Sequence, residues 1–412
     1  MTSTTDLLGA DERARLFQRI IKPRVLADPY PDYAELFGDT RVLESPLPQV
    51  LDGILLSSYE DCLDLVRSRS FGALDAAHLD MLGHEWRSSG AERVVRRAVG
   101  FRNSPQHQHF RAAMAPHFTP RRIAALRDSI SATVDEVLGS LTGREADLVA
   151  DVARPLPAAV MGSVFGIDRS TTRELVRLGE DTGAILDPIR SPAQNRRMEA
   201  STLAMVEIFD GLIAERRAAP DDTLLSSIVE AFSRDGEEHE DLVGNLVFLF
   251  TAGHETLTGF LGLALRALLD EPAQADLLRN DPDLASSAVE ELLRFDAPVQ
   301  MLFRMADEPA VLGDRKVQPG TLVIGLVGAA HRDPQQFTAP ARLDLTRDGV
   351  RPLSFGAGPH YCLGAALARL EAEVLLPRLL RAFPGMRPCG SPRFRSPGVV
   401  LRGLETLPVL LR

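Results

Sequence analysis

The segment from Leu246 to Leu269 constrains the fold more than any other part of the chain, because it is apolar on nearly every side of a helix. Such a helix lies either in a membrane or in the core of a protein. Its middle is interrupted by the sequence GHET, Gly253 to Thr256, and Arg266 follows near its end. Charged groups at mid-span are costly in lipid, and the chain has no second segment of this kind. We therefore predict a long helix through the protein core, with a polar notch halfway along it.

Helical periodicity dominates the rest of the chain, which has no internal repeat, low-complexity tract or evident linker. Strand-like pieces are short and lie towards the two ends. The pattern predicts a chain that is mainly α with small β-sheets, and it marks no boundary within residues 1–412. The clearest predicted helices cover 123–141, 203–217 and 284–295, the strand-like pieces cover 41–45, 53–58, 322–327 and 398–403, and the β-rich portions lie near 39–58, 310–328 and 390–410.

Composition argues against some classes of partner. The net charge is −11, from 46 basic and 57 acidic residues, which disfavours a nucleic-acid partner. The three cysteines, Cys62, Cys362 and Cys389, are far apart and odd in number, so we expect no disulfide framework and a reducing compartment. The N-terminal residues resemble neither a signal peptide nor a membrane anchor. We therefore expect a cytoplasmic protein that binds neither nucleic acid nor a membrane.

Cys362 stands where a glycine-rich loop runs into a helix that we expect to begin near Leu363. A helix N-terminus offers partial positive charge and unpaired N–H groups, which favour ionisation of a cysteine to the thiolate. A thiolate can attack a substrate, form a disulfide or bind a metal, whereas the commonest fate of a single cysteine is burial in the core. These residues alone leave all four roles open.

Several short motifs follow one another in the order known from the cytochrome P-450 family, which this chain resembles. The loop Phe355-x-Gly-x-Gly-x-His-x-Cys-x-Gly364 is similar to the family's haem-binding loop, and Ala252 to Thr256 is similar to its oxygen-binding motif. An E-x-x-R motif alone has no diagnostic value, but the whole set in this order is highly specific. The other motifs are Glu291-x-x-Arg294, PARLD at 340–344, His107-x-x-x-Arg111, DPYPDY at 28–33 and HRDP at 331–334.

The resemblance implies a haem b cofactor in a cytochrome P-450 fold. In that fold a long central helix crosses over the haem, and the cysteine loop precedes a proximal helix. Cys362 would be the metal ligand, as a thiolate that donates electron density to the iron. Phe355 would shield the sulfur, and three glycines would let the backbone approach the porphyrin closely. The glycines are Gly356, Gly358 and Gly364, and the groups implied for the haem propionates are His107, Arg111, Arg304 and His360.

A buried triad of Glu291, Arg294 and Arg342 behind the haem is also implied by the resemblance. The residues by themselves allow a simpler interpretation of Glu291 and Arg294, as a surface ion pair worth a few tenths of a kcal/mol. The family usually has Phe after the last arginine of this triad, where this chain has Leu343.

In the polar notch, Ala252 and Gly253 would leave a groove for O2 over the iron. The Glu255 carboxylate and the Thr256 hydroxyl would form an acid–alcohol pair that relays protons through water to the bound oxygen. The alternative for Thr256 is a hydrogen bond back to its own helix, which is common for threonine.

The implied activity is an O2-dependent monooxygenase that hydroxylates or epoxidises a small, hydrophobic molecule of secondary metabolism. Electrons would come from a ferredoxin and an NAD(P)H-dependent ferredoxin reductase. We expect a monomer whose substrate is either free or tethered to a carrier protein. The pocket would draw on 72–101, 183–190, 249–252, 299–303 and the turn near Val399.

Other activities stay open at this stage. A peroxide-driven peroxygenase and an oxidative coupling enzyme belong to the same family, and a non-catalytic haem-binding protein is a different class. Family peroxygenases typically lack the acid–alcohol pair, and a haem sensor needs no proton relay. The presence of Glu255 and Thr256 therefore favours activation of O2.

The segment from Glu85 to Phe101 would form a mobile lid over the pocket. On a helix, Arg93, Arg96 and Arg97 would share one face. The simpler interpretation is a solvated arginine face. The other is that the arginines recruit an anionic group, either a substrate carboxylate or the phosphopantetheine of a carrier protein.

Overall fold

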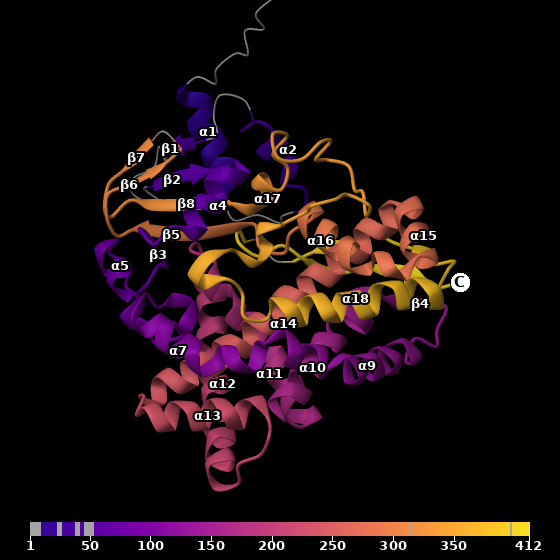
Figure 1. The fold of residues 1–412 in the computed structure, drawn as a ribbon, viewed down its shortest axis with the longest axis horizontal. Helices are drawn as coiled ribbons and strands as arrows, with labels where there is room; N and C mark the ends of the chain where they lie inside the picture. Colours follow the sequence, from indigo (N-terminus) through magenta and orange to yellow (C-terminus); the bar gives the residue numbers. More distant parts are fainter. Residues whose placement is uncertain (1–9, 23–26, 38–41, 45–52, 314, 396–397) are drawn as a thin grey trace, which may run out of the picture.

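The computed structural model describes residues 10–22, 27–37, 42–44, 53–313, 315–395 and 398–412. A large helical body makes up most of the molecule, with a smaller β-rich part at the top left of Figure 1. The long helix α14, His239–Asp270, runs through the body and packs against α18, Ala365–Ala382. The predicted fold class, mainly α with small sheets, is therefore confirmed.

Helix α14 is long and apolar enough to cross a membrane, but 72% of its most apolar stretch is buried inside the protein. Its first half contributes Leu246 and Phe250 to one hydrophobic cluster, and its second half contributes Leu261 and Leu265 to another. The polar notch lies between these two clusters. The helices packed against α14 include α10 (Pro155–Phe165), α11 (Arg169–Thr182), α12 (Pro192–Ala218), α15 (Pro272–Asn280) and α18.

Two of the predicted helices are confirmed, because 203–217 lies inside α12 and 284–295 matches α16, Ala285–Phe295. The prediction of one helix over 123–141 is wrong, since the chain forms α8 and α9 with a break at Ala125 and Leu126. The remaining helices are α1 (Ala10–Ile21), α2 (Tyr30–Ala34), α4 (Tyr59–Arg67), α5 (Ala76–Met81), α6 (Gly90–Val95), α7 (Gln106–Met114), α8 (Pro120–Ala124), α9 (Arg127–Gly139), α13 (Leu224–Asp235) and α17 (Val327–Ala330).

The largest sheet has the strand order β1-β2-β8-β5-β3. Strand β8 pairs parallel with β2 and antiparallel with β5. The predicted strands at 53–58 and 322–327 are confirmed as β2 and β8; of the piece at 41–45, only 42–44 is described, as β1. Strand β5, which the sequence did not predict, carries Arg304. The strands are β1 (Val42–Glu44), β2 (Gly53–Leu56), β3 (Phe71–Gly72), β5 (Met301–Ala306) and β8 (Leu322–Leu326), with the hairpin β6 (Ala310–Leu312) and β7 (Arg315–Val317) beside them.

The C-terminal strands lie against the helical body. Strand β12 (Pro408–Leu410) pairs with β4 (Glu145–Asp147) and β9 (Arg387–Pro388), and β10 (Arg393–Phe394) pairs with β11 (Leu404–Thr406). The predicted strand at 398–403 is wrong. The carboxylate of Asp187 accepts the backbone N–H groups of Val399 and Val400 at 2.7 and 2.9 Å, so the chain forms a turn there.

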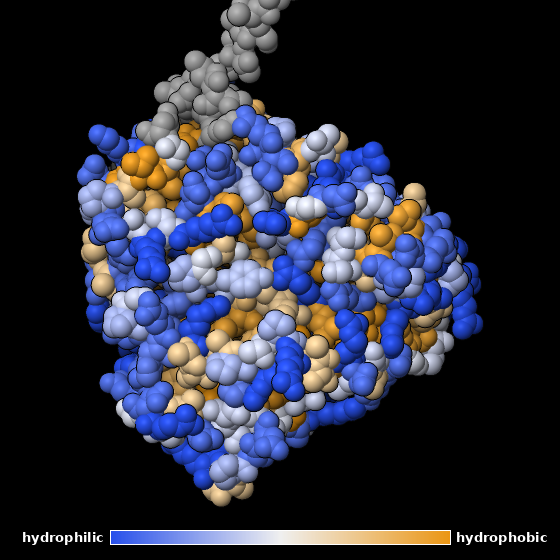
Figure 2. Space-filling model, in the orientation of Figure 1, coloured by the Kyte–Doolittle hydropathy of each residue, from blue (hydrophilic) through white to orange (hydrophobic). Residues whose placement is uncertain are grey.

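The face of the molecule seen in Figure 2 is mostly hydrophilic, and its hydrophobic side chains form separate small groups. In the part of the chain that the structure describes, the large apolar side chains with high exposure are Met81, Leu82, Leu203, Leu277, Val311 and Tyr361.

Candidate active site

A cavity of about 380 Å³ lies between α14 and α18, next to the loop that carries Cys362. We call it the main cavity. Cys362 is exposed on its wall, opposite residues from the polar notch of α14. The structure thus brings together residues from motifs that are far apart in the chain. The predicted residues that line the main cavity are His107, Arg111, Ala252, Gly253, Thr256, Arg304, Phe355, His360, Cys362 and Gly364.

The cysteine loop has a backbone that only glycine adopts readily. Gly358 has a φ of +66°, and a Cβ added there would lie 2.5 Å from the carbonyl oxygen of Val66. The loop is closed by a hydrogen bond from the Cys362 N–H to the carbonyl oxygen of Phe355, at 3.0 Å. Helix α18 begins just after it, at Ala365 rather than near Leu363. The fold therefore fixes the place of the sulfur through the backbone.

Opposing effects act on the ionisation of Cys362. Burial raises the pKa of the thiol, and this effect outweighs the hydrogen bond from the Gly364 N–H and the charge of Arg111, which lower it. The thiolate needs a further positive partner, such as a metal ion, in the main cavity.

Four basic side chains face the main cavity from three different elements. The rings of His107 and His360 stand with their centroids 4.0 Å apart. Burial, together with Arg304, His107 and Arg111, lowers the pKa of His360 to about 3. Among the described residues, no carboxylate pairs with Arg111 or Arg304, although burial lowers the pKa of both. Two partly buried arginine charges without a carboxylate partner, beside two imidazole rings that can donate hydrogen bonds, favour the binding of an anion.

Glu255 in the polar notch is almost completely buried and forms an ion pair with Arg395, which follows strand β10. The Nδ1 atom of His254 lies 3.3 Å from the second carboxylate oxygen of Glu255. Burial acts to raise the pKa of Glu255, but Arg395 and His254 more than offset this effect and hold that pKa at about 2. Glu255 is therefore a carboxylate at neutral pH.

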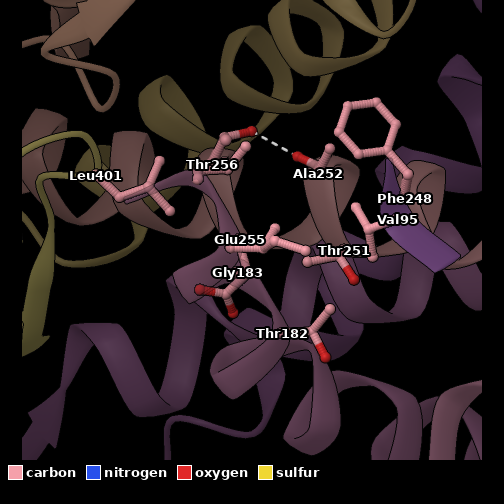
Figure 3. Close-up of a pocket in the computed structure, with 11 residues that line it drawn as sticks. Val95, Thr182, Gly183, Phe248, Thr251, Ala252, Glu255, Thr256 and Leu401 are labelled. Carbon is pink, nitrogen blue, oxygen red and sulfur yellow. Dashed lines mark hydrogen bonds between the residues drawn. The ribbon is translucent and has the colours of Figure 1, made fainter. Parts of the chain in front are cut away.

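The Thr256 hydroxyl donates a hydrogen bond to the carbonyl oxygen of Ala252, at 2.7 Å, as Figure 3 shows. This is the alternative interpretation of Thr256, a bond back to its own helix. The carboxylate of Glu255 points away from this hydroxyl, towards Gly183. The acid and the alcohol are neighbours in the chain but do not touch in this conformation, because successive side chains diverge around a helix.

Gly253 lines the main cavity, but the reason for its missing side chain differs from the one expected. A Cβ added at Gly253 would lie 2.9 Å from the methyl carbon of Met161 on α10. The space is thus used for close packing between α14 and α10. The groove in the notch is left by Ala252, whose side chain is small and which lines the main cavity.

The family model described as cytochrome P450 matches residues 84–389. Cytochrome P450 107B1 of Saccharopolyspora erythraea is 36% identical, over 90% of this chain and 93% of its own. The chain belongs to the cytochrome P450 family. PikC, a cytochrome P450 monooxygenase of Streptomyces venezuelae, is 32% identical over 94% of this chain and 92% of its own. The structure of P450BioI in complex with an acyl carrier protein bearing hexadec-9Z-enoic acid superposes with a TM-score of 0.86, at 28% identity, over 93% of this chain and 98% of that one.

Members of the cytochrome P450 family bind haem b, and the residues of the main cavity fit this group. The two haem propionates supply the anions that the four basic side chains lack, and the iron supplies the positive partner that the Cys362 thiolate needs. Gly364 lines the main cavity together with Cys362, and a Cβ added there would meet nothing within 4 Å. A flat, doubly anionic metal porphyrin matches all three features.

Glu291 and Arg294 are both fully buried, so they do not form a surface ion pair. The Arg294 Nε and Nη2 atoms donate to the two carboxylate oxygens at 2.7 and 2.8 Å. Arg294 Nη1 donates to the carbonyl oxygens of His331 and Pro340, both at 2.8 Å. Every nitrogen of this buried guanidinium therefore has a partner, which is the condition under which a buried charge pair is tolerated.

The prediction that Arg342 completes this triad is wrong. The Arg342 side chain is 70% exposed, and only its carbonyl oxygen contacts Arg294. Arg347 takes the place instead, with Nε 3.2 Å from the Glu291 carboxylate. The chain turns after Ala339, at a φ of +47°, and Arg347 binds the carbonyl oxygens of this turn, so the later arginine reaches inwards. Sequence spacing cannot show which arginine of a loop faces inwards.

The arginine face predicted for the lid segment does not exist as such. Arg96 is buried and pairs with Glu92, which also accepts a hydrogen bond from Arg190. Arg97 pairs with three acidic residues on or near the start of α14. Only Arg93 is exposed and forms no ion pair in the described part of the chain; it donates to the carbonyl oxygen of Arg87. Neither a shared solvated face nor a shared anion site is therefore available to the three arginines.

Sequence reasoning missed three further charged residues at the site, Arg347, Arg395 and Glu371. Glu371 on α18 lines the main cavity, and its Oε2 atom is buried without a hydrogen-bond partner in the described structure. Burial raises the pKa of Glu371 to about 8. Its position among the apolar residues of α18, next to Leu370 and Ala372, was a signal that could have found it. No signal in the sequence pointed to the two arginines, whose places depend on how distant segments pack.

Proposed function

We propose that this protein is a haem–thiolate monooxygenase that uses O2 and two externally supplied electrons to hydroxylate or epoxidise a small hydrophobic molecule of bacterial secondary metabolism. One observation carries the proposal. An exposed cysteine faces a cavity lined by four basic side chains, and a buried acid and an alcohol lie on the opposite helix. We further propose one domain over the whole chain, a monomeric state and a cytoplasmic location.

Haem, when bound, supplies iron that binds and activates O2. The chain's own residues divide the remaining work. Cys362 holds the iron from the loop side, and His107, Arg111, Arg304 and His360 bind the propionates. Glu291, Arg294 and Arg347 fix the segment behind the loop. Ala252 leaves room over the haem, and Glu255 and Thr256 deliver protons from the α14 side.

The acid–alcohol pair is also the reason to prefer O2 over peroxide as the oxidant. A peroxide-driven enzyme receives its oxygen already protonated, and a non-catalytic haem protein has no evident need for a buried, ionised acid beside the cavity. Maintaining Glu255 as a buried charge costs free energy. A role in proton delivery would explain why the protein keeps this buried charge.

The substrate proposal rests on the lining of the main cavity and on the relatives. Apart from the basic groups, the wall is largely apolar, with Val99, Phe165, Phe248, Leu249 and Val299 among its members. P450BioI binds a lipid carried by a protein. A carrier-tethered substrate is therefore part of the proposal, with Arg93 as the exposed arginine of the lid. Titration of the ferric haem spectrum with a metabolite library, free and carrier-bound, tests both forms.

The cofactor assignment is tested with Cys362→Ala. The purified wild-type protein should be red, and its reduced carbon-monoxide complex should show the strongly red-shifted Soret band that thiolate ligation produces. The variant should lose this band. Cys389→Ala, which removes another exposed cysteine, is the matched control and should keep it. A red-shifted band in Cys362→Ala would overturn the assignment.

A further inference from the structure

Arg369 on α18 contacts three side chains next to the cysteine loop. Its Nε and Nη2 atoms donate to the two carboxylate oxygens of Glu290 on α16, and its Nη1 atom donates to the Tyr361 hydroxyl at 2.9 Å. Its guanidinium carbon lies 4.4 Å from the centre of the Phe355 ring. Helices α16 and α18 pack side by side, as Figure 1 shows. One guanidinium therefore links α16 to both ends of the loop that leads to Cys362.

These contacts lie immediately around Cys362. Tyr361 precedes it in the chain, and the carbonyl oxygen of Phe355 accepts the Cys362 N–H at 3.0 Å. Burial raises the pKa of the Cys362 thiol, and the effects that lower it include the charges of Arg111 and Arg369. The charge of Arg369 therefore acts on the sulfur.

The two charges that act on the sulfur have different partners. Arg111 faces the main cavity and is proposed to bind a haem propionate, which would neutralise it. Arg369 is paired with Glu290, a residue of the protein itself. The pair is only partly exposed, with 26% of the Arg369 side chain and 21% of the Glu290 side chain open to solvent. Water therefore screens these two charges less than it screens a fully exposed pair.

The backbone of the cysteine loop has anchors other than Arg369. The Ser354 hydroxyl donates to a carbonyl oxygen of α16 at 3.0 Å, and the Leu353 N–H donates to Nε2 of His331 at 2.7 Å. These neutral hydrogen bonds hold the start of the loop in place. What Arg369 adds to them is a positive charge near the sulfur, and what Glu290 adds is a negative charge that offsets it.

We propose that Arg369 and Glu290 together set how readily the bound haem accepts an electron. An added electron makes the site around Cys362 more negative, so the charge of Arg369 favours the reduced state and the charge of Glu290 opposes it. Arg369 acts through Phe355 and the sulfur and is a positioning residue. This inference rests on the proposed function and identifies residues that control the uptake of its electrons.

The electron balance of this effect is simple. The holoenzyme takes up one electron from an external one-electron donor, the ferric form becomes the ferrous form, and no bond to the protein is made or broken. Arg369 and Glu290 exchange neither an electron nor a proton in this step. They change its equilibrium only through their charges, so removing one or the other should shift that equilibrium in opposite directions.

The experiment is an equilibrium redox titration of the purified holoenzyme without substrate. Dithionite supplies the electron, a dye of known potential reports the potential, and the Soret band reports the ratio of ferrous to ferric protein. Arg369→Met leaves Glu290 without its partner and should lower this ratio at a fixed potential by about three- to tenfold. Glu290→Gln leaves Arg369 without its partner and should raise the ratio by about the same factor.

Three further variants show whether charge is the cause. The double variant Arg369→Met/Glu290→Gln should lie between the two single variants, because both charges are gone. Arg369→Lys keeps the positive charge and should stay close to the wild type. Arg378→Met is the matched control, since Arg378 lies roughly 13 Å further along α18 and pairs with Asp135, and it should change the ratio little. The opposite shifts of the single variants should shrink at high salt, which screens partly exposed charges.

Shifts of Arg369→Met and Glu290→Gln in the same direction, or equal ratios for all variants, would overturn the inference and leave the monooxygenase proposal intact. A merely structural role would lower the yield of holoenzyme or shift both variants alike, and this result also counts against the inference. If Arg369→Met does not accumulate, Glu290→Gln decides alone, because a raised ratio supports the inference and an unchanged one overturns it. Absence of the red-shifted carbon-monoxide band from the wild type would instead overturn the proposed function itself.

Discussion

This protein contains two buried Glu–Arg ion pairs whose surroundings differ. In the pair of Glu291 and Arg294, both side chains have 0% exposure and every guanidinium nitrogen is bonded. In the pair of Glu255 and Arg395, the arginine is partly hydrated and has acidic neighbours to move towards. The difference teaches that the surroundings of a buried ion pair, rather than the pair itself, decide whether it can open.

The physical basis is the cost of separating the charges. Opening the Glu291 pair would leave two ions without water, while the backbone carbonyls around Arg294 would lose their donors. The Arg395 side chain is 26% exposed and has Asp187 and Glu180 as further electrostatic partners, so opening the Glu255 pair would cost less. A fully buried ion pair therefore stabilises the fold, whereas an ion pair with a partly exposed partner can open at a lower cost.

The largest effect that tests this comparison is expected for Glu291→Gln. Removing one partner of a fully buried pair costs about 3–5 kcal/mol, which is a large share of the stability of a typical domain. We expect little haem-loaded protein, measured as the ratio of Soret to protein absorbance. Glu290→Gln, at the next position but partly exposed, is the control and should cost much less. A normal yield and haem content for Glu291→Gln would contradict the closed character of this pair.

A smaller effect is expected for Arg347→Ala, which removes the second arginine on Glu291. Arg347 is mostly buried and also donates to the carbonyl oxygens of the turn after Thr338, so its loss should cost about 2–3 kcal/mol. The measurement is urea-induced unfolding of the holoenzyme. Arg342→Ala is a matched control from the same loop, and its exposed side chain predicts a change within about 0.5 kcal/mol. If Arg342→Ala cost more stability than Arg347→Ala, Arg342 would be the third member of the triad.

Glu371 offers a third case, a buried glutamate that pairs with no arginine in the described part of the chain, and the smallest expected effect. Burial raises its pKa to about 8 in the folded protein, above the unfolded value of 4.5. The folded state therefore binds more protons between these values, and stability falls as pH rises through that window. Glu371→Gln should reduce the loss of stability between pH 6 and pH 8 by about 1–2 kcal/mol.

The matched control for this prediction is Glu373→Gln on the same helix, a partly exposed residue that pairs with Arg127. It should leave the pH dependence of unfolding unchanged. Parallel pH curves for the wild type and Glu371→Gln would show that Glu371 is ionised in the folded protein and that an unseen partner compensates its charge.

The sequence by itself determined the family, the central helix and most of the residues around the main cavity. These features are local or have fixed spacing: an apolar run with a notch, a glycine loop before a helix, and pairs three or four positions apart on one helix. Local patterns can be recognised in the sequence because backbone geometry and helix periodicity act over a few residues. The strand-like pieces at 53–58 and 322–327 were recognisable for the same reason.

Only the tertiary structure decided which distant side chains complete these local arrangements. It placed Arg347 rather than Arg342 on Glu291, brought Arg395 from the C-terminal hairpin to Glu255, and turned 398–403 away from a strand by capping it with Asp187. It also paired Arg96 and Arg97 of the lid with different acidic residues. The physical reason is that the free energy of a charge depends on its burial and its partners, and both are set by packing between segments that the sequence keeps far apart.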